Sequence, residues 1–296
     1  MDTTSAPNDP PPTRSTTGLP TSPLREVTDD EVDAFRRDGV VLLRGVLPLS
    51  WVDALDGPVD RVVGEGEAVD MGPMAGADDD APAFAGGVDH WRAHPVFREF
   101  ATASPLAGIV ARLLGSRTVH LWEDSVLVKE PGSPFPTYFH TDDSYFHLTG
   151  RQVCTTWVPL DAADPDSGVV RWVRGSHLDG IDYRPNLFVT PEPIPGTVGE
   201  VVPDVLDTPE LAERLVTFAV EPGDVTVHHA RTLHGAPANT SDRRRRAVSV
   251  RYTGDDVRYL HKPGLPGRVG LDEVADGDPV GEPWCPRVWP PGSVVD

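Results

Sequence analysis

Positive charge is scarce in this chain of 296 residues, which has 26 basic against 46 acidic side chains and a formal net charge of −20. Such a negative balance repels phosphates and argues against a protein that binds nucleic acid or anionic membranes. Cys154 and Cys285 are too few and too far apart for a disulfide framework or a cysteine-based zinc site. No apolar run approaches the ~20 residues that a membrane helix needs, and the N-terminus lacks the basic-then-apolar order of a signal peptide. These absences predict a soluble protein of the reducing cytoplasm.

The rest of the composition is that of a globular domain. A hydrophobic fraction of 39% with 24% charged residues is ordinary for a folded protein, and the length suffices for one sizeable core. Residues 1–24 are the exception, because their Pro, Thr, Ser and Asp side chains bury too little apolar surface to offset the entropy of ordering. We therefore predict a disordered tail over residues 1–24 and a single domain over residues 25–296.

The N-terminal half of the domain carries helix signals. A capping box over Thr28–Glu31 opens a short helix, and a buried strand follows over 40–43. Pro48 begins a second helix, and an apolar stripe predicts a third helix over 95–114. Residues 64–90 are rich in Gly, Ala and Asp with little periodicity, and we interpret them as a long loop that serves as a lid.

From residue 119 the apolar pattern changes to period two, which indicates short strands separated by Gly, Pro and Asp turns. The expected strands are 119–129, 136–147, 152–159, 169–173, 215–220, 224–230 and 246–253. Residues 180–212 interrupt this pattern with many prolines and form a second lid candidate, with a small helix over 208–214. The whole predicts a mainly β (α+β) fold, a sandwich or barrel with N-terminal helices packed on one sheet.

The densest chemistry lies where a predicted strand carries His140 and Asp142. Side chains two residues apart on a strand share a face, so an imidazole and a carboxylate would lie side by side, as suits a divalent metal that prefers nitrogen and oxygen. A His-x-Asp tripeptide alone is weak evidence, and a solvated loop is the competing interpretation. Three further histidines, His228, His229 and His234, follow a Pro-Gly-Asp turn and offer a second imidazole ligand.

A run of four arginines over 243–246 leads directly into another predicted strand. On that strand one face carries Arg245, Ala247, Ser249 and Arg251. An arginine that points between sheets beside small residues can pair with a carboxylate in bidentate fashion, whereas the competing interpretation is a solvated basic patch. Two histidines, one carboxylate and an inward arginine are together the parts that bind Fe(II), a bidentate oxo-acid and O₂.

Five segments in this order resemble the phytanoyl-CoA dioxygenase family of Fe(II)/2-oxoglutarate-dependent oxygenases, over roughly residues 26–260. The segments are Thr28–Pro48, Phe135–Asp142 (FPTYFHTD), Trp157–Asp161 (WVPLD), Ser167–His177 (SGVVRWVRGSH) and Pro222–Arg246. The resemblance implies that His140, Asp142 and His234 are the iron ligands.

The resemblance also assigns the cosubstrate site. Arg245, eleven residues after His234, corresponds to the family's arginine that binds the far carboxylate of 2-oxoglutarate, and Trp157 and Ser125 correspond to residues beside it. The chain departs from the family at Ala236, where a small hydroxyl residue is common. Arg245 is therefore expected to carry more of the cosubstrate binding.

The fold implied by the resemblance is a double-stranded β-helix, a cupin-like jelly roll. The implied activity is oxidation of a small organic molecule with Fe(II), 2-oxoglutarate and O₂, with hydroxylation in natural-product metabolism as our first hypothesis. Desaturation, epimerisation and oxidative ring formation use the same ligands and stay open, as does a non-catalytic jelly-roll binding protein. A halogenase is disfavoured, because Asp142 fills the position that a halide needs.

Residues beside the metal-binding strand are candidates for a substrate pocket, with core packing as the competing interpretation. They are Tyr138, Tyr145, Phe146 and His147. His229 is a candidate to orient a metal ligand, whereas we expect His228 to face away from the metal. The only lysines, Lys129 and Lys262, form no positive cluster for a CoA pyrophosphate. We therefore expect a small-molecule substrate, no nucleic-acid or membrane partner, and a monomer or homodimer.

Overall fold

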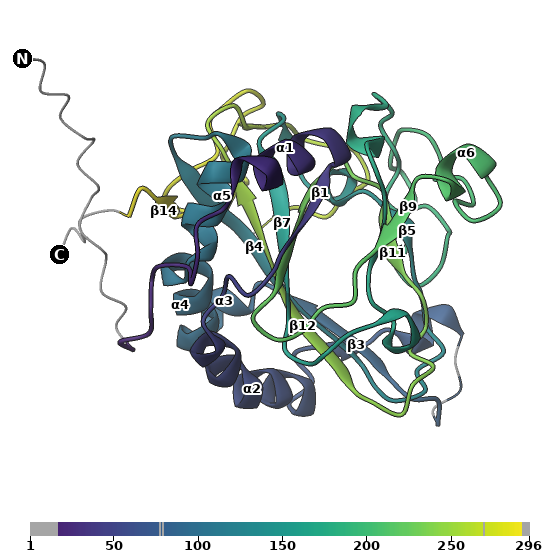
Figure 1. The fold of residues 1–296 in the computed structure, drawn as a ribbon. Helices are drawn as coiled ribbons and strands as arrows, with labels where there is room; N and C mark the ends of the chain where they lie inside the picture. The colour runs from purple at the N-terminus through teal and green to yellow at the C-terminus, as the bar shows by residue number, and fades with distance from the viewer. Residues whose placement is uncertain (1–16, 77, 79, 269, 292–296) are drawn as a thin grey trace, which may run out of the picture.

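Two antiparallel sheets face each other in the computed structural model, and most of the helices lie along the outer side of the larger sheet (Figure 1). The structure describes residues 17–76, 78, 80–268 and 270–291. Within these residues no helix is long and apolar enough to cross a membrane.

The larger sheet has eight strands and joins segments that are far apart in the chain. Seven strands lie in the order β1 (Val40–Leu43), β10 (Val225–His229), β7 (Val153–Pro159), β12 (Arg245–Thr253), β4 (Val119–Lys129), β3 (Phe84–Val88) and β2 (Val69–Asp70), and β14 (Arg287–Trp289) also pairs with β4.

The smaller sheet has four strands and carries part of the candidate site. Its order is β5 (Thr137–His140), β11 (His234–Ala236), β8 (Arg171–Val173) and β9 (Leu215–Thr217). A separate ribbon pairs β13 (Arg258–Tyr259) with β6 (Leu148–Thr149). Most neighbouring strands in these two facing antiparallel sheets are non-consecutive in sequence, as in a double-stranded β-helix, so the predicted fold class is confirmed.

The helices follow local signals in the sequence. They are α1 (Asp29–Asp38), α2 (Leu49–Gly64), α3 (His90–Ala93), α4 (Pro95–Ala103), α5 (Leu106–Leu114) and α6 (Pro209–Ala212), with 3₁₀ turns over Gly72–Ala75, Asp142–Tyr145, Pro165–Ser167 and Ser176–Leu178. The Thr28 side chain and the Glu31 side chain cap α1 reciprocally, as the capping box predicts. Gly39 ends α1 at φ 73°, a conformation that favours glycine.

Strict alternation along β12 separates the core from the cavity between the sheets. Val248, Val250 and Tyr252 face the helices and join the main apolar cluster. The intervening residues, Ser249 and Arg251 among them, line the space between the sheets. Helix packing therefore fixes the face of β12 that carries the candidate cosubstrate residues.

Two predicted elements in the N-terminal half of the domain differ from the structure. The helix expected over 95–114 is broken between α4 and α5, because Pro105 excludes helical backbone at Ser104, which is extended with ψ 167°. Residues 64–90 are not a continuous loop, because β3 lies within them and pairs along β4. The sequence of β3, Phe-Ala-Gly-Gly-Val, has little strand propensity, so its pattern gave no strand prediction.

The predicted disordered tail is wrong over its last part. Residues 17–24 pack on the domain: the Trp51 indole donates to the Pro20 carbonyl at 2.8 Å, and the Leu24 amide donates to the Val46 carbonyl at 2.9 Å. The rest of the predicted tail, residues 1–16, lies outside the described residues.

Candidate metal centre

His140, Asp142 and His234 come together although they lie on separate elements. His140 ends β5 and His234 begins β11, and the strand register pairs the two histidines directly. Asp142 is not on the strand, because a 3₁₀ turn begins there. Its Oδ1 nevertheless lies 3.8 Å from Nε2 of each histidine, and the three side chains are buried. These three residues therefore offer a compact set of two nitrogens and one oxygen.

Backbone carbonyls fix both imidazole rings for metal binding. Nδ1 of His140 bonds to the Tyr138 carbonyl at 2.8 Å, and Nδ1 of His234 bonds to the Thr232 carbonyl at 2.9 Å. Because a carbonyl only accepts, each Nδ1 carries the proton and each Nε2 presents a lone pair. Burial lowers the pKa of both histidines, which keeps the rings neutral.

Asp142 supplies the negative charge of the set. Burial acts to raise the pKa of Asp142, but His234, Arg251 and His228 together hold the pKa well below its usual value. Two neutral imidazoles and one carboxylate are the donor set of non-haem Fe(II) oxygenases, so these residues fit that metal.

The structure contradicts the expected orientation of His228. Nε2 of His228 lies 3.0 Å from Oδ2 of Asp142, and the Thr155 hydroxyl donates to the same oxygen. His229 instead turns away and bonds to the Arg151 carbonyl at 2.7 Å. Oδ2 therefore has two partners, which leaves Oδ1 to face the histidines.

Alternation along β10 explains this orientation and was readable in the sequence. Val225 and Val227 face the apolar core under the helices, so Thr226 and His228 must face the other sheet. The sequence prediction was wrong because it placed His229, and not His228, on the strand face that points toward the metal. Val225 and Val227 show which face belongs to the apolar core.

Arg245 lies in the same cavity as the ligands and has no ionic partner in the part of the chain that the structure describes. The side chain is 1% exposed, and its guanidinium lies 5.8 Å from the Trp157 ring. Among the described residues none accepts a hydrogen bond from it, and its Nε is buried without a partner. Burial lowers the pKa of Arg245 to about 10, so the group stays charged at neutral pH. A buried, unpaired cation is costly and is therefore a strong site for an anion.

The other three arginines of the run are surface ion-pair partners. Arg243 pairs with Asp164 at 2.6 Å, and Arg246 pairs with Asp161 at 2.8 Å. Arg244 pairs with Glu130 at 2.9 Å. The run is therefore not a uniform basic patch, because Arg245 lines the cavity and the other three arginines do not.

Trp157 lines the cavity, whereas Ser125 is linked to it through a second arginine. The Ser125 hydroxyl accepts from Nη1 of Arg251 at 2.6 Å. Arg251 itself lines the cavity, with Nη2 3.8 Å from Oδ1 of Asp142. The sequence prediction gave Arg251 no role.

The four predicted pocket residues separate into different environments. Tyr138 is 37% exposed and points outward. Phe146 packs in a core cluster with Trp122. His147 is held by the Pro266 carbonyl and stacks on His261.

Tyr145 alone contacts the metal centre, with its ring edge-on to His140 at 5.5 Å between centroids. The strand ends at His140, so the period-two assumption that grouped these residues no longer applies beyond it.

Phe188 covers the metal centre, although it lies far in sequence from the four pocket candidates beside the metal-binding strand. Its ring centroid lies 5.1 Å from that of His140, and it lines the cavity. The backbone of Phe188 has φ 68°, unusual for a residue other than glycine, and Asn186 accepts a hydrogen bond from its N–H at 2.9 Å. Phe188 belongs to residues 180–212, which the sequence marks as a lid.

Known proteins match this chain in sequence and in fold. The phytanoyl-CoA dioxygenase (PhyH) family matches residues 35–247. The 2-aminoethylphosphonate dioxygenase of uncultured bacterium HF130_AEPn_1 is 28% identical over 161 residues, which cover 54% of this chain and 55% of the relative. The chain spans about half the length of the curated relatives that it matches.

Two solved structures are similar over nearly their whole length. The non-haem α-ketoglutarate-dependent carbocyclase SnoK from nogalamycin biosynthesis has 27% identity and a TM-score of 0.70, with 89% of this chain and 97% of SnoK covered. The epimerase SnoN, in complex with Fe³⁺, α-ketoglutarate and nogalamycin RO, has 27% identity and a TM-score of 0.69, with 88% and 98% covered.

Proposed function

The chain belongs to the phytanoyl-CoA dioxygenase family, and from this premise we propose that it is an Fe(II)- and 2-oxoglutarate-dependent dioxygenase that hydroxylates a small organic molecule of natural-product metabolism. His140, Asp142 and His234 hold the iron. Arg245 binds the far carboxylate of 2-oxoglutarate, beside Trp157.

The buried, unpaired Arg245 is the observation that carries this proposal. A protein that bound only a metal would have no use for an isolated guanidinium between the sheets, where desolvation disfavours the charge. A dicarboxylate that chelates the metal through one end and reaches Arg245 with the other satisfies both features. This pairing also argues against a non-catalytic jelly-roll binding protein.

The chain's own residues bind, orient and exclude water. Trp157 and Phe188 provide apolar walls for the cavity, and Arg245 orients the cosubstrate through its guanidinium. His228 and Thr155 hold Oδ2 of Asp142, so that Oδ1 faces the metal. Iron bound at this site supplies the activation of O₂ and the oxidation of a substrate C–H bond.

Ring formation or epimerisation is the second candidate function. The similarity to SnoK and SnoN, which spans nearly all of both proteins, favours it. These reactions and hydroxylation use the same ligand set, so the cavity around the substrate decides among them.

An acyl-CoA substrate is less well supported. Both lysine side chains are engaged internally, Lys129 with the Pro237 carbonyl and Lys262 with the Asp143 carbonyl. Neither is free to bind a pyrophosphate.

Anaerobic titration with Fe(II) and 2-oxoglutarate tests the proposed class. We expect a weak visible charge-transfer band for the native protein and none for His234→Ala, because the chelate requires the complete ligand set. A native protein without this band would be a binding protein and not an oxygenase.

Product analysis then tests the reaction. A screen of natural products, read by succinate release and product mass, separates the candidates. Hydroxylation adds one oxygen, ring formation or desaturation removes two hydrogens, and epimerisation leaves the mass unchanged.

A further inference from the structure

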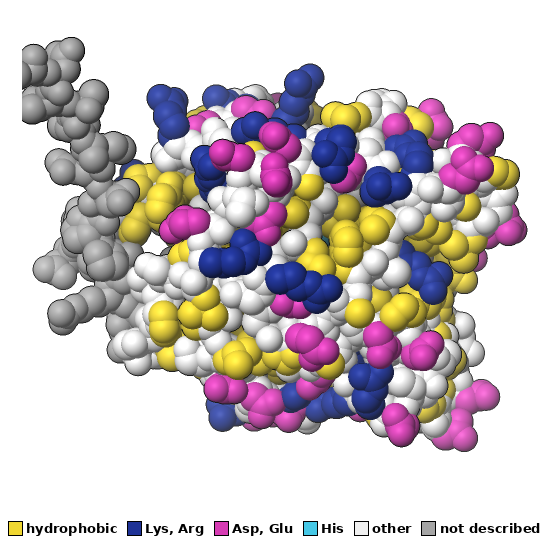
Figure 2. All heavy atoms as spheres, viewed as in Figure 1, with side chains coloured by type: hydrophobic (Ala, Val, Ile, Leu, Met, Phe, Trp, Pro, Cys, Tyr) yellow, Lys and Arg dark blue, Asp and Glu magenta, His cyan; other side chains and the backbone are white. Residues whose placement is uncertain are grey.

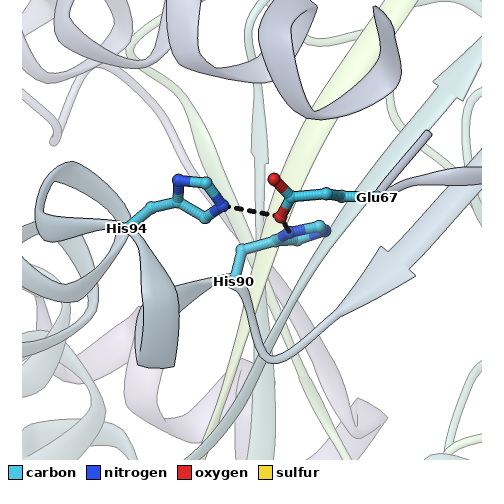
Figure 3. A group of neighbouring side chains, drawn as sticks. All are labelled: Glu67, His90 and His94. Atoms are coloured by element: carbon cyan, nitrogen blue, oxygen red, sulfur yellow. Dashed lines mark hydrogen bonds and ion pairs between the residues drawn. The ribbon is translucent and has the colours of Figure 1, made fainter. Parts of the chain in front are cut away.

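A second group of potential metal ligands lies where the segment after α2 meets the turn between α3 and α4 (Figure 3). Glu67 follows α2, His90 begins α3, and His94 immediately precedes α4. Oε2 of Glu67 lies 2.6 Å from Nε2 of His94 and 3.9 Å from Nδ1 of His90. Figure 3 shows the carboxylate directed between the two imidazole rings.

The two histidine rings are held in place by their surroundings. They are one helical turn apart, since the His94 amide donates to the His90 carbonyl at 2.9 Å. The buried Phe97 ring packs against both, with centroids 5.5 Å from His90 and 6.0 Å from His94. Both imidazoles therefore present fixed nitrogens toward Glu67.

The Glu67 backbone and the His90 ring both pack closely against Gly87 of β3. A Cβ on Gly87 would lie 2.6 Å from Nε2 of His90 and 2.9 Å from the Glu67 carbonyl oxygen, so only glycine fits there. Nε2 of His90 thus faces the backbone of Gly87, and the ring turns Nδ1 toward the carboxylate. Burial lowers the pKa of His90, which leaves the ring neutral and able to bind a metal.

We propose that Glu67, His90 and His94 bind a divalent transition-metal ion, with Zn²⁺ as the best match, at a site separate from the iron centre. Two imidazole nitrogens and one carboxylate oxygen are a known zinc donor set, with water as the fourth ligand. This site shares no residue with the proposed iron and 2-oxoglutarate site, so the two proposals can be tested separately.

The present distances require only a small rearrangement. Tetrahedral zinc with bonds of about 2.0–2.1 Å places donor atoms about 3.3 Å apart. The two distances from Glu67, 2.6 and 3.9 Å, lie on either side of that value. The Glu67 side chain is 40% exposed and is free to move between the rings, and the same exposure gives the ion a path of entry.

A metal at this site would tie the segment before β2 to the turn after β3. β3 pairs along β4, where Val88 lies opposite Ser125 and Gly86 lies opposite Leu127, a residue of the cavity wall. The ion would therefore fix the edge of the larger sheet and not take part in the oxidation.

Metal stoichiometry tests this proposal with Co²⁺ as the probe. After metal removal and anaerobic equilibration with Co²⁺, the native protein should retain one more ion per chain than Glu67→Gln or His94→Gln. The matched controls are Glu65→Gln and His261→Gln, which change an exposed glutamate and an exposed histidine away from the site and should retain the native count.

The comparison does not depend on the iron centre. In a His140→Ala/His234→Ala protein, whose iron ligands are removed, Glu67→Gln should still lower the cobalt content by one ion. Zn²⁺ should also raise the melting temperature of that double variant, and should not do so once Glu67→Gln is added. Equal cobalt contents with and without Glu67→Gln would overturn the proposal, and the three side chains would then be a hydrogen-bonded histidine–glutamate group.

Discussion

Arg245 differs from its neighbours in the arginine run by its burial and not by its chemistry. We expect Arg245→Ala to weaken 2-oxoglutarate binding by about 2–5 kcal/mol, because a desolvated carboxylate loses its partner. This corresponds to roughly 30- to 4,000-fold in the dissociation constant. Anaerobic titration of the charge-transfer band measures the effect.

Arg243→Ala is the control for this prediction, since Arg243 pairs with Asp164 at the surface and should leave the affinity unchanged. Equal losses in the two variants would point to a diffuse basic surface and would remove Arg245 from the site.

His228 holds a metal ligand in place without being one of the three expected ligands. We predict that His228→Ala lowers Fe(II) affinity by roughly 10- to 100-fold, because Oδ2 of Asp142 loses a donor and the carboxylate can rotate. Anaerobic Fe(II) titration gives the affinity, and a melting curve separates this effect from unfolding. His229→Ala, on the same strand but facing Arg151, should bind iron normally. If His228→Ala bound Fe(II) with native affinity, the hydrogen bond from His228 to Asp142 would not contribute to metal binding.

At this scale the sequence predicted residues whose spacing is fixed by chemistry. The face of Arg245 could be predicted from alternation along its strand. His140 and Asp142 were paired by their two-residue offset, but Asp142 reaches His140 from a 3₁₀ turn and not from the strand. The placement of Phe188 over the metal centre could not be predicted, because it depends on a loop conformation with positive φ that no local sequence pattern indicates.

Among the elements, β4 bears a buried acid that makes stability depend on pH. The Asp124 carboxylate accepts from the Trp91 amide near the start of α3, and burial raises the pKa of Asp124 to about 7. The unfolded chain releases this proton near pH 4, so the folded state binds more protons between pH 4 and 7, and stability falls as pH rises through that window. The loss amounts to about 4 kcal/mol by pH 8.

Asp124→Asn should remove this loss and make the protein more stable than the native chain at pH 8. Urea unfolding at pH 5 and pH 8 measures the difference. Asp53→Asn, at an exposed position of α2, is the matched control and should keep the native pH profile. A native profile in Asp124→Asn would show that Asp124 is ionised in the folded protein.

Elements were predictable where a local signal agreed with the packing. The capping box defines α1, and long alternation defines β4 and β12. β11 was missed because it is three residues long, too short to show a period. β3 was missed because two glycines interrupt it, and its place is set by pairing with β4.

Across the whole molecule, Arg268 fastens the C-terminal segment to the larger sheet. Its guanidinium donates to Glu123 at 2.7 Å and to Asp89 at 3.0 Å, and lies over the Trp122 ring at 4.3 Å. We predict that Arg268→Ala lowers the free energy of unfolding by about 1–3 kcal/mol, because the half-buried Glu123 and Asp89 each lose one of their two cationic partners.

Urea unfolding measures this loss. Arg287→Ala removes an exposed arginine from the same segment and should change stability little. If the two variants were equally stable, the contacts of Arg268 would contribute nothing beyond the rest of the C-terminal fold. The sequence could not reveal these pairings, since they join residues more than one hundred positions apart.

The histidine ligands stand on the smaller sheet and Arg245 on the larger one. A 2-oxoglutarate molecule bound to both the metal and Arg245 would cross-link the two sheets. Its binding free energy would therefore stabilise the packing of one sheet on the other. The reverse also holds. A distant substitution that increases the separation of the two sheets lowers the affinity for 2-oxoglutarate without changing any residue that binds it. The affinity for 2-oxoglutarate therefore reports on how closely the two sheets pack against each other.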